Sequence, residues 1–344
     1  MGAEPVAADA PAVDGVVTLA HGGGGRATRQ LLRTVVAAAF GEEVCRDDQA
    51  RLNARPGRPA LTTDAFVVSP RTFPGGDIGS LSVYGTVNDL AVGGAEPAWL
   101  SCALILEEGL PLAELASVCR SMAAAAARCG VRVVTGDTKV VPRGQADGLY
   151  VATTGVGFIP DGVDLDQRHI RPGDVVVLNG DVGRHGACVA GRRQDFGLRH
   201  EIRSDCAPLH ELCGAMVAAG GVRYLRDATR GGVASVANEL AEASGCRLAL
   251  DEAAIPVEGA VRALCELLGL SPLELACEGR LVGVVAPESA DAVLAAMRGC
   301  EEGEGACVVG GVRSGGEPPV TLTTYLGVET VLAMPAGELL PRIC

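Results

Sequence analysis

Residues 73–95 of this chain read FPGGDIGSLSVYGTVNDLAVGGA and combine structural and chemical signals in one stretch. The segment from Gly79 onward has the pattern of a helix, which the glycine pair at positions 93 and 94 stops. The preceding GGDIG favours close approach of the backbone to a ligand, because glycine carries no side chain. Asn88 and Asp89 come together inside the helix pattern. The stretch therefore predicts a helix that carries an amide and a carboxylate.

Strand and helix patterns alternate on both sides of this predicted helix. Residues 60–70 have the pattern of a strand that ends at a proline, and residues 98–110 that of a buried strand. Residues 111–130 form an alanine-rich helix pattern with proline near its start and glycine at its end. Further strands are predicted at 131–141 and 149–159. This alternation is typical of the mixed α/β or α+β class.

The polar, turn-rich segment 160–174 separates this part from a second unit of strands and helices. We expect a flexible extension over residues 1–15, an N-terminal domain over 16–159, a C-terminal α+β domain over 170–330 and an irregular, mobile tail over 331–344.

The composition argues against several classes of protein. The 344 residues are 48% hydrophobic, which is enough for a core, and the net charge of −13 argues against a nucleic-acid surface. No apolar run reaches the roughly 18 residues that would span a bilayer, and the start of the chain lacks the pattern of a signal peptide. The 13 cysteines include no C-x-x-C pair, which argues against a zinc site or a disulfide framework. We expect reduced thiols and a cytoplasmic protein.

Five aspartates stand in short polar motifs and are candidate ligands for Mg²⁺ and phosphate: Asp48, Asp64, Asp89, Asp137 and Asp227. An aspartate beside glycine or threonine is also common in turns and helix caps, so each one alone has that alternative. Asp64 is the exception, because it lies within an apolar strand, where an unpaired carboxylate is costly to bury. Several such carboxylates together suit Mg²⁺, which prefers oxygen ligands and leaves room for phosphate oxygens.

Three other features are candidates for binding or catalysis. His21 precedes the four glycines Gly22, Gly23, Gly24 and Gly25, which could cradle phosphate with backbone N–H groups or act as a flexible linker. Lys139 is the only lysine in the chain and follows Asp137 and Thr138 after a predicted strand, where a surface ion pair is the alternative. Glu278 precedes a glycine and a strand, where a solvated turn residue is the alternative.

The chain ends on Cys344 within the sequence PRIC. An exposed thiol in a segment of this kind is a liability, and drift is one explanation for it. A prenylation signal is another, but such a signal places its cysteine four residues from the end. The tail by itself leaves these alternatives open.

Seven motifs together resemble the family of hydrogenase maturation carbamoyl dehydratases (HypE), over nearly the whole chain from His21 to Cys344. The motifs are residues 73–95 together with ILEEGLP, VTGDTKVV, RSDCAPL, DATRGGVASVANELA, CEGRLV and PRIC. This family is similar to aminoimidazole ribonucleotide synthetase, selenophosphate synthetase and thiamine monophosphate kinase. The sequence departs from the family pattern at Ala228, where proline is common, and at Cys277 and Arg280 on either side of Glu278 and its glycine.

The resemblance implies a two-domain fold like that of aminoimidazole ribonucleotide synthetase, with an N-terminal dimerising ATP-binding domain, a C-terminal α+β domain and a mobile tail. It implies ATP-dependent dehydration of a carbamoyl group on Cys344 to a thiocyanate, which supplies cyanide for the iron centre of [NiFe]-hydrogenase. The implied partners are the carbamoyltransferase HypF, the HypC–HypD complex and a second copy of the chain, with no nucleic acid and no membrane.

The resemblance also implies roles for the candidate residues. The implied catalytic residues are Cys344 as carrier, Lys139 as a neutralising cation and Glu278 as general base. The implied metal ligands for Mg²⁺ are Asp48, Asp64, Asp89 and Asp227. The implied ATP-binding residues are His21, Gly22, Gly23, Gly24, Gly25, Asp64, Asn88, Asp137 and Thr138.

Two other readings stay open at this point. Another ATP-dependent enzyme of the same superfamily is possible, but a selenophosphate synthetase would need a reactive cysteine in the glycine-rich loop, which has none here. A scaffold whose tail only docks a partner is the non-enzymatic alternative. A scaffold leaves the acidic motifs and the single lysine unexplained.

Overall fold

The computed structural model describes residues 13–45, 47–193, 202–337, 340 and 342–344. Most of the predicted extension over residues 1–15 lies outside these ranges. Its described end is held, because Leu112 donates its N–H to the Gly15 carbonyl at 3.0 Å and Val16 forms a bridge with Pro111. The backbone at Gly15 is therefore paired with the start of a helix.

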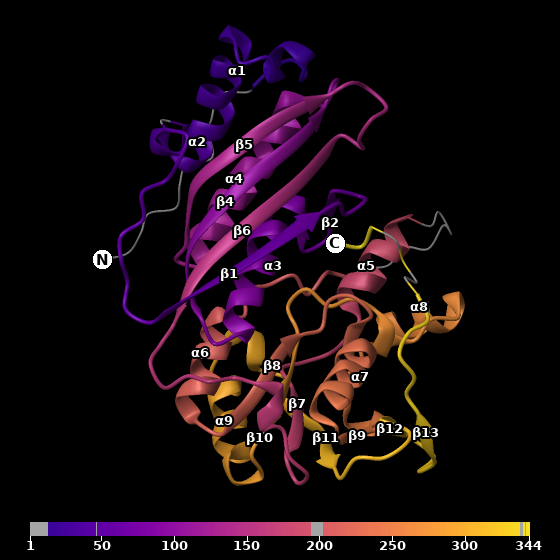
Figure 1. Cartoon of the computed structure of the whole chain (residues 1–344). Helices are drawn as coiled ribbons and strands as arrows, with labels where there is room; N and C mark the ends of the chain where they lie inside the picture. Colours follow the sequence, from indigo (N-terminus) through magenta and orange to yellow (C-terminus); the bar gives the residue numbers. More distant parts are fainter. Residues whose placement is uncertain (1–12, 46, 194–201, 338–339, 341) are drawn as a thin grey trace.

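Two β-sheets form the two halves of the molecule (Figure 1). The N-terminal sheet has the strand order β1-β6-β4-β5, and the C-terminal sheet the order β13-β12-β9-β11-β7-β10-β8. The strands are β1 (Arg58–Phe66), β2 (Thr72–Phe73), β3 (Gly76–Asp77), β4 (Glu96–Glu107), β5 (Arg132–Val141), β6 (Leu149–Ile159), β7 (Val175–Leu178), β8 (Val222–Asp227), β9 (Arg247–Asp251), β10 (Leu281–Val285), β11 (Cys307–Arg313), β12 (Val320–Thr323) and β13 (Glu329–Val331). Parallel pairs occur between β4 and β5 and between β9 and β12, while the other pairs are antiparallel. The mixed sheets and intervening helices confirm the predicted α+β class.

Helices pack against both sheets. They are α1 (Arg26–Leu31), α2 (Ala37–Phe40), α3 (Ile78–Val92), α4 (Leu112–Arg128), α5 (Arg184–Arg193), α6 (His210–Ala219), α7 (Gly232–Ser244), α8 (Gly259–Leu268) and α9 (Ala290–Arg298). The chain leaves the N-terminal sheet at Ile159 and enters the C-terminal sheet at Val175. In the part of the chain that the structure describes, no helix combines the length and apolar character needed to cross a membrane.

Helix α3 is the predicted helix of residues 73–95, and it lies between the two halves. The Asp77 side chain caps it by accepting from the Ser80 N–H at 2.8 Å, and Gly93 ends it. Of its 15 residues, 13 are buried, because α3 contacts β1 and β6 on one side and α6 and β8 on the other. A helix covered on all sides carries apolar or small residues all round, and this helix packs against elements of both halves.

Strand β5 corrects one detail of the sequence interpretation. The strand predicted over residues 131–141 forms as β5 and contains Asp137 and Lys139, so Lys139 lies within the strand and does not follow it. Backbone pairing with β4 continues as far as Val141, so both side chains project from the sheet itself. Because the two residues are two positions apart in a strand, their side chains lie on the same face of the sheet.

The predicted tail begins at Val331, the last residue of β13, and its described residues from Leu332 onward are docked on the protein without further helix or strand. Leu332 is buried and donates its N–H to the Val320 carbonyl at 3.1 Å. Ile343 is also buried. The tail runs from β13 back to the junction of the two halves, where the C-terminus lies (Figure 1). The structure therefore gives the tail a resting position inside the molecule.

Candidate active site

Five acidic side chains line one cavity at the junction of the two halves, and one of them, Glu239 of α7, is paired with Arg226 at 3.2 Å. Asp64 comes from β1, Asp89 from α3, Asp227 from the end of β8 and Glu278 from the turn before β10. The cavity has a volume of about 320 Å³, and Cys344 lines it as well. The structure thus brings together three of the four predicted metal ligands and two of the three predicted catalytic residues.

Close packing between α3 and β1 positions two of these carboxylates. Gly85 makes this packing possible, because a Cβ atom there would lie 2.9 Å from the Phe66 ring. The Thr62 hydroxyl donates to Asp89 Oδ2 at 2.8 Å, and the Ala65 N–H donates to Asp64 Oδ1 at 2.7 Å. The strand therefore orients both carboxylates without neutralising them.

The aspartates of this cluster repel one another in a partly dry environment. Burial is the main reason that the pKa values of Asp64 and Asp89 are raised, and the charge of Asp64 adds to the effect at Asp89. Burial, followed by the charge of Asp89, raises the pKa of Asp227 to about 7. Carboxylates with raised pKa values favour any ligand that brings positive charge between them.

Glu278 is the most deeply buried acid of the cluster. Burial raises its pKa well above the usual value, and the charges of Asp227 and Asp205 raise it further. Its backbone N–H donates to Asp205 Oδ1 at 3.1 Å, which fixes the turn. Its side-chain Oε1 atom is buried and has no hydrogen-bond partner among the described residues. A buried carboxyl oxygen of this kind is available to a ligand in the cavity.

The donor set fits Mg²⁺ bound together with phosphate. In the described ranges, no three or more His, Cys, Asp and Glu side chains are already gathered into a closed metal site. Mg²⁺ does not require one, because it usually binds one or two carboxylates and completes its coordination with water and phosphate oxygens. Asp64, Asp89 and Asp227 stand around an open cavity, and after burial the charges of Asp89 and Asp64 raise the pKa of Asp227, as suits that kind of binding.

The docked tail pairs with the residues that directly follow β1. Val67 donates its N–H to the Cys344 carbonyl at 3.0 Å, and Ser69 donates its N–H to the Arg342 carbonyl at 3.2 Å. Arg342 secures this pairing, since its Nε donates to the Val67 carbonyl at 2.9 Å and its Nη2 lies 2.8 Å from Asp147 Oδ2. The last residues of the chain are therefore held like an added short strand.

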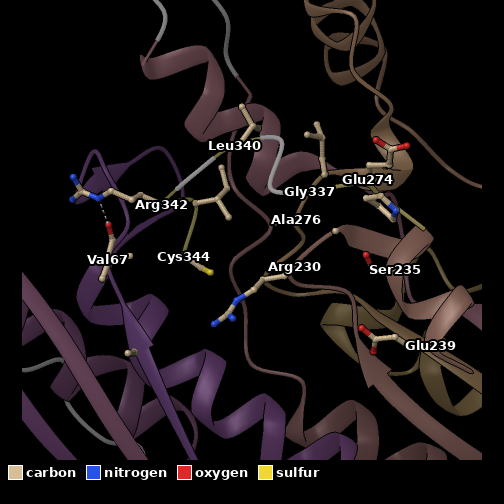
Figure 2. A pocket seen from close by; sticks show the side chains of 15 residues that line it. Val67, Arg230, Ser235, Glu239, Glu274, Ala276, Gly337, Leu340, Arg342 and Cys344 are labelled. Atoms are coloured by element: carbon tan, nitrogen blue, oxygen red, sulfur yellow. Dashed lines mark hydrogen bonds between the residues drawn. The ribbon is translucent and has the colours of Figure 1, made fainter. Parts of the chain in front are cut away.

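The thiol of Cys344 faces the guanidinium group of Arg230 (Figure 2). Both residues line the acidic cavity and also a neighbouring cavity of about 460 Å³ that follows the tail. Burial raises the pKa of the Cys344 thiol to about 12, and the charge of Glu278 contributes, whereas Arg230 lowers the pKa. The docked thiol is thus protonated at neutral pH and sits where the two cavities meet.

A second set of predicted residues lies elsewhere. Asp48, Asp137 and Thr138 line a separate cavity of about 510 Å³ between β4, β5 and the N-terminal helices. Lys139 Nζ lies 2.8 Å from Asp137 Oδ2, and both side chains are exposed. Within one chain, neither Asp48 nor Lys139 joins the acids around Cys344.

The glycine-rich segment lies beside β5. His21 belongs to a short turn in which its Nδ1 accepts the Thr18 N–H at 2.9 Å. Gly22 packs against Val140, where an added Cβ atom would lie 3.0 Å from the valine Cβ. Gly24 and Gly25 have open space around them. The turn at the start of the segment contacts β5, which is the strand that carries Asp137. None of these residues lines the acidic cavity.

The side chain of Asn88 is occupied by hydrogen bonds within the chain. Its Nδ2 donates to the Ala207 carbonyl at 3.0 Å, and its Oδ1 accepts the Leu209 N–H at 2.7 Å. These bonds tie α3 to the loop that precedes α6. The predicted contact of Asn88 with ATP gains no support from this arrangement.

The sequence interpretation missed two residues that contact the tail. Arg230 lies in the RDATRGG motif, which was interpreted only for Asp227 and its glycines; a cation next to a glycine pair was a usable signal. His185 hydrogen-bonds to the Ile343 backbone, and no local pattern in the sequence singles it out.

Comparisons with known proteins identify the family of the chain. The family "AIR synthase related protein" matches through its N-terminal domain at residues 46–159 and its C-terminal domain at residues 171–322. The carbamoyl dehydratase HypE of Rhodobacter capsulatus is 52% identical over 334 residues, covering 95% of this chain and 98% of the relative. HypE of Escherichia coli K12 is 45% identical over 337 residues, covering 95% and 99%.

Two solved structures are similar over most of the chain. A HypE in complex with ATP has a TM-score of 0.90 and 41% identity, covering 95% of this chain and 99% of that one. A HypE chain from a HypE–HypF complex has a TM-score of 0.78 and 40% identity, covering 89% and 99%. With two domains of the AIR synthase related type and near-full-length identity to these enzymes, the chain belongs to the HypE family of hydrogenase maturation carbamoyl dehydratases.

Proposed function

We propose that this protein uses ATP to dehydrate a carbamoyl group carried on its own Cys344, giving a protein thiocyanate. One observation carries the proposal: the Cys344 thiol lies in the same cavity as Asp64, Asp89, Asp227 and Glu278. The similar HypE with bound ATP supports ATP as the second substrate. The cyanide is destined for the iron centre of a [NiFe]-hydrogenase, in line with the maturation role of the family.

The proposed reaction has two steps. In the first, the oxygen of –S–C(=O)–NH₂ attacks the γ-phosphorus of ATP, ADP leaves, and an O-phosphorylated imidate forms with loss of one nitrogen proton. In the second, the remaining nitrogen proton is removed, the C–O bond breaks, phosphate leaves and –S–C≡N forms. The net change is loss of water from the carbamoyl group, coupled to conversion of ATP to ADP and phosphate. Phosphate is a better leaving group than an amide oxygen, and that difference explains the need for ATP.

The acidic cavity suits both steps. Mg²⁺ held by Asp64, Asp89 and Asp227 would supply positive charge to the triphosphate. Burial is the main reason that the pKa of Glu278 is raised, and the ion would offset the further rise that comes from the neighbouring aspartates. Glu278 lies in the same cavity as the thiol and offers an unpartnered Oε1, so it is placed to take a nitrogen proton as general base. Phosphoryl transfer needs positioning and charge neutralisation more than covalent help.

The docked thiol is a poor nucleophile for its own loading. A thiol whose pKa is about 12 has very little thiolate at neutral pH, and the thiolate is the reactive form. We infer that the tail is loaded while undocked, by a carbamoyltransferase of the HypF type, which the similar HypE–HypF complex supports. Leu332 is held by its backbone hydrogen bond to Val320. If the end of the tail is released, the chain from Leu332 to Cys344 could extend about 40 Å. The tail would return to the cavity for dehydration and later present the thiocyanate to a HypC–HypD complex.

The outer face of the N-terminal sheet supports a homodimer. Along β6, buried residues alternate with partly exposed ones, so one face packs on α3 and the other lacks a cover among the described residues. Leu61 of β1 is 72% exposed and Ile105 of β4 is 38% exposed on that outer face. A second copy would bury this apolar surface. It would also bring another Asp137 and Lys139 into the interface.

The test is the intact mass of the C-terminal peptide. The protein is incubated with the carbamoyltransferase, carbamoyl phosphate and ATP, and then chased with Mg·ATP. Addition of one carbamoyl group to Cys344, followed by ATP-dependent loss of one water, is the expected result. Cys344→Ser is the matched control and should gain no mass. A Cys344 that stays unmodified beside a control substrate that is loaded would contradict the proposal.

A further inference from the structure

His185 on α5 is a buried titratable side chain that the proposed reaction does not use. It is fully buried, and its ring packs edge-on against Phe73 with centroids 5.2 Å apart. Phe73 belongs to the N-terminal half and α5 to the C-terminal half. The imidazole therefore lies at the junction of the two halves, where the tail docks.

Both ring nitrogens of His185 have partners, and these partners fix its tautomer. Nε2 lies 2.7 Å from the Ile343 carbonyl oxygen, which can only accept, so Nε2 carries the proton. Nδ1 lies 2.8 Å from the Ser204 hydroxyl, which donates to it in the neutral ring. The same hydroxyl accepts the Cys206 N–H at 3.0 Å. Burial lowers the pKa of His185 and keeps the ring neutral.

The tail is held from both halves through successive carbonyl groups. The carbonyls of Arg342 and Cys344 accept from the backbone N–H groups of Ser69 and Val67 on the N-terminal side, and the Arg193 side chain at the end of α5 also donates to the Arg342 carbonyl. The carbonyl between them, that of Ile343, accepts from His185 on the C-terminal side. This alternation is that of a strand bonded on both edges. Ile343 itself is buried, so the residue next to the thiol is fixed by its side chain and its backbone.

We propose that His185 is a positioning residue that latches the tail in the cavity by donating its Nε2–H to the Ile343 carbonyl. The bond exists only while the tail is docked. It sets the direction of the chain one residue before Cys344 and so places whatever the thiol carries against the acidic cluster. The part of this inference that concerns dehydration rests on the proposed function, whereas the part that concerns docking does not.

The hydrogen bond from His185 to the tail has opposite effects on the loading step and on the dehydration step. Loading needs the tail outside, and dehydration needs it inside. Losing one buried hydrogen bond that forms only on docking shifts the docking equilibrium about three- to tenfold toward the undocked state. Loading should then become faster or stay unchanged, while dehydration should become slower.

Two substitutions isolate the latch. In His185→Asn the amide reaches only the Nδ1 position, so the bond to Ser204 is kept and the bond to Ile343 is lost. In His185→Gln the amide reaches the Nε2 position and keeps a donor for Ile343. His210→Asn is the matched control, because His210 is a partly buried histidine of α6 with no contact to the tail. Ser204→Ala gives a milder disturbance, since it removes only the hydroxyl that orients the ring.

The first readout is the rate at which iodoacetamide alkylates Cys344 at pH 8, followed by the mass of the C-terminal peptide, with no ATP and no carbamoyltransferase. We expect about three- to tenfold faster alkylation in His185→Asn. Rates near the wild-type value are expected in His185→Gln and His210→Asn, and an intermediate rate in Ser204→Ala. Thermal unfolding checks that each variant is folded. Equal rates in a folded His185→Asn variant and the wild type would overturn the latch, and the Ser204→Ala rate decides the matter should the Asn variant not fold.

The second readout separates a latch from general damage. Carbamoyl loading at limiting carbamoyltransferase and single-turnover dehydration of preloaded protein are measured on the same variants. Slower dehydration with loading that is unchanged or faster supports the positioning role. Slowing of both steps alike would overturn it. Faster alkylation in a chain that is never loaded would support the latch and contradict only the proposed function.

Discussion

Lys139 and Asp64 point to opposite faces of the same four-stranded sheet. Asp64 is level with Thr153 of β6, whose hydroxyl donates to a carbonyl of α3 on the inner face. Lys139 is level with Ile105 of β4, which is exposed on the outer face. Strands β1 and β5 are also three places apart in the sheet, a separation of about 14 Å. One chain therefore does not bring its own lysine to its own acidic cavity.

This geometry leads to a complementation prediction for Lys139. If a second copy supplies the lysine, Lys139→Ala and Glu278→Gln are each inactive alone, but a mixed dimer contains one intact site. We expect mixing followed by subunit exchange to restore about half of the wild-type dehydration rate per mixed dimer. Mixed dimers are verified by native mass spectrometry.

The control for this experiment pairs two residues of the same cavity. Glu278→Gln mixed with Asp227→Asn should stay inactive. Each chain supplies both residues to its own cavity, so one cavity of the mixed dimer lacks Glu278 and the other lacks Asp227. If verified mixed dimers of Lys139→Ala and Glu278→Gln also stay inactive, a catalytic lysine from the second copy is ruled out.

We expect Asp227→Asn to lower the dehydration rate and to raise the stability of the protein. The folded-state pKa of Asp227 is about 7, raised from 3.8. The folded protein thus binds more protons than the unfolded chain between these values, so its stability falls as pH rises from about 4 to 7. Asparagine removes this loss, and we expect the variant to be more stable by on the order of 1–3 kcal/mol at pH 8 without metal, with little gain near pH 4.

The measurement is chemical unfolding of Asp227→Asn and the wild type in EDTA at pH 4, 6 and 8. Addition of Mg²⁺ and ATP should stabilise the wild type more than the variant, and dehydration should slow by a factor of about 10² or more in the variant. A stability difference that does not change with pH would show that Asp227 is not the group that titrates.

Glu278→Gln tests the general base. The amide keeps the size of the side chain but cannot take a proton, so dehydration of preloaded protein should slow by about 10²- to 10⁴-fold while loading is unchanged. Single-turnover mass spectrometry measures both. Glu274→Gln is the matched control, because Glu274 lines the neighbouring cavity that follows the tail and should leave the rate unchanged. A normal dehydration rate in Glu278→Gln would remove the assignment.

The docked thiol predicts how tail docking depends on pH. Its pKa is about 12 when docked and 9.0 for an ordinary thiol, so only the undocked thiol ionises between these values. Docking should therefore be pH-independent below about 9 and weaken by up to tenfold per unit above it. Hydrogen–deuterium exchange of the tail amides, normalised to a free peptide of the same sequence, measures this. In Cys344→Ser the profile should stay flat, and a wild-type profile as flat as that one would refute the shift.

The sequence by itself was sufficient for local structure and for the family of the chain. The glycines that bound α3, the proline at the start of α4 and the apolar runs of the strands are local signals, and the elements appear where these signals predict them. Acidic residues in apolar or glycine-rich surroundings were equally visible, because an unpaired carboxylate is costly in such places. Asp64 could be named for this reason, whereas Asp89 and Asp227 were named from short polar motifs and Glu278 from the resemblance to the family.

Only the tertiary structure decided which of these residues meet. Convergence of Asp64, Asp89, Asp227 and Glu278 depends on how α3 packs between the two halves, and a residue pattern along one segment carries no information about that packing. The same patterns gave no reason to separate Lys139 from Asp64, since the face of a sheet to which a side chain points is set by strand register. The resting place of Cys344 depends on His185, Val67 and Ser69, whose backbone and ring contacts are long-range in sequence. Local sequence determines the chemistry available to each residue, and the packing of distant segments determines which groups that residue meets.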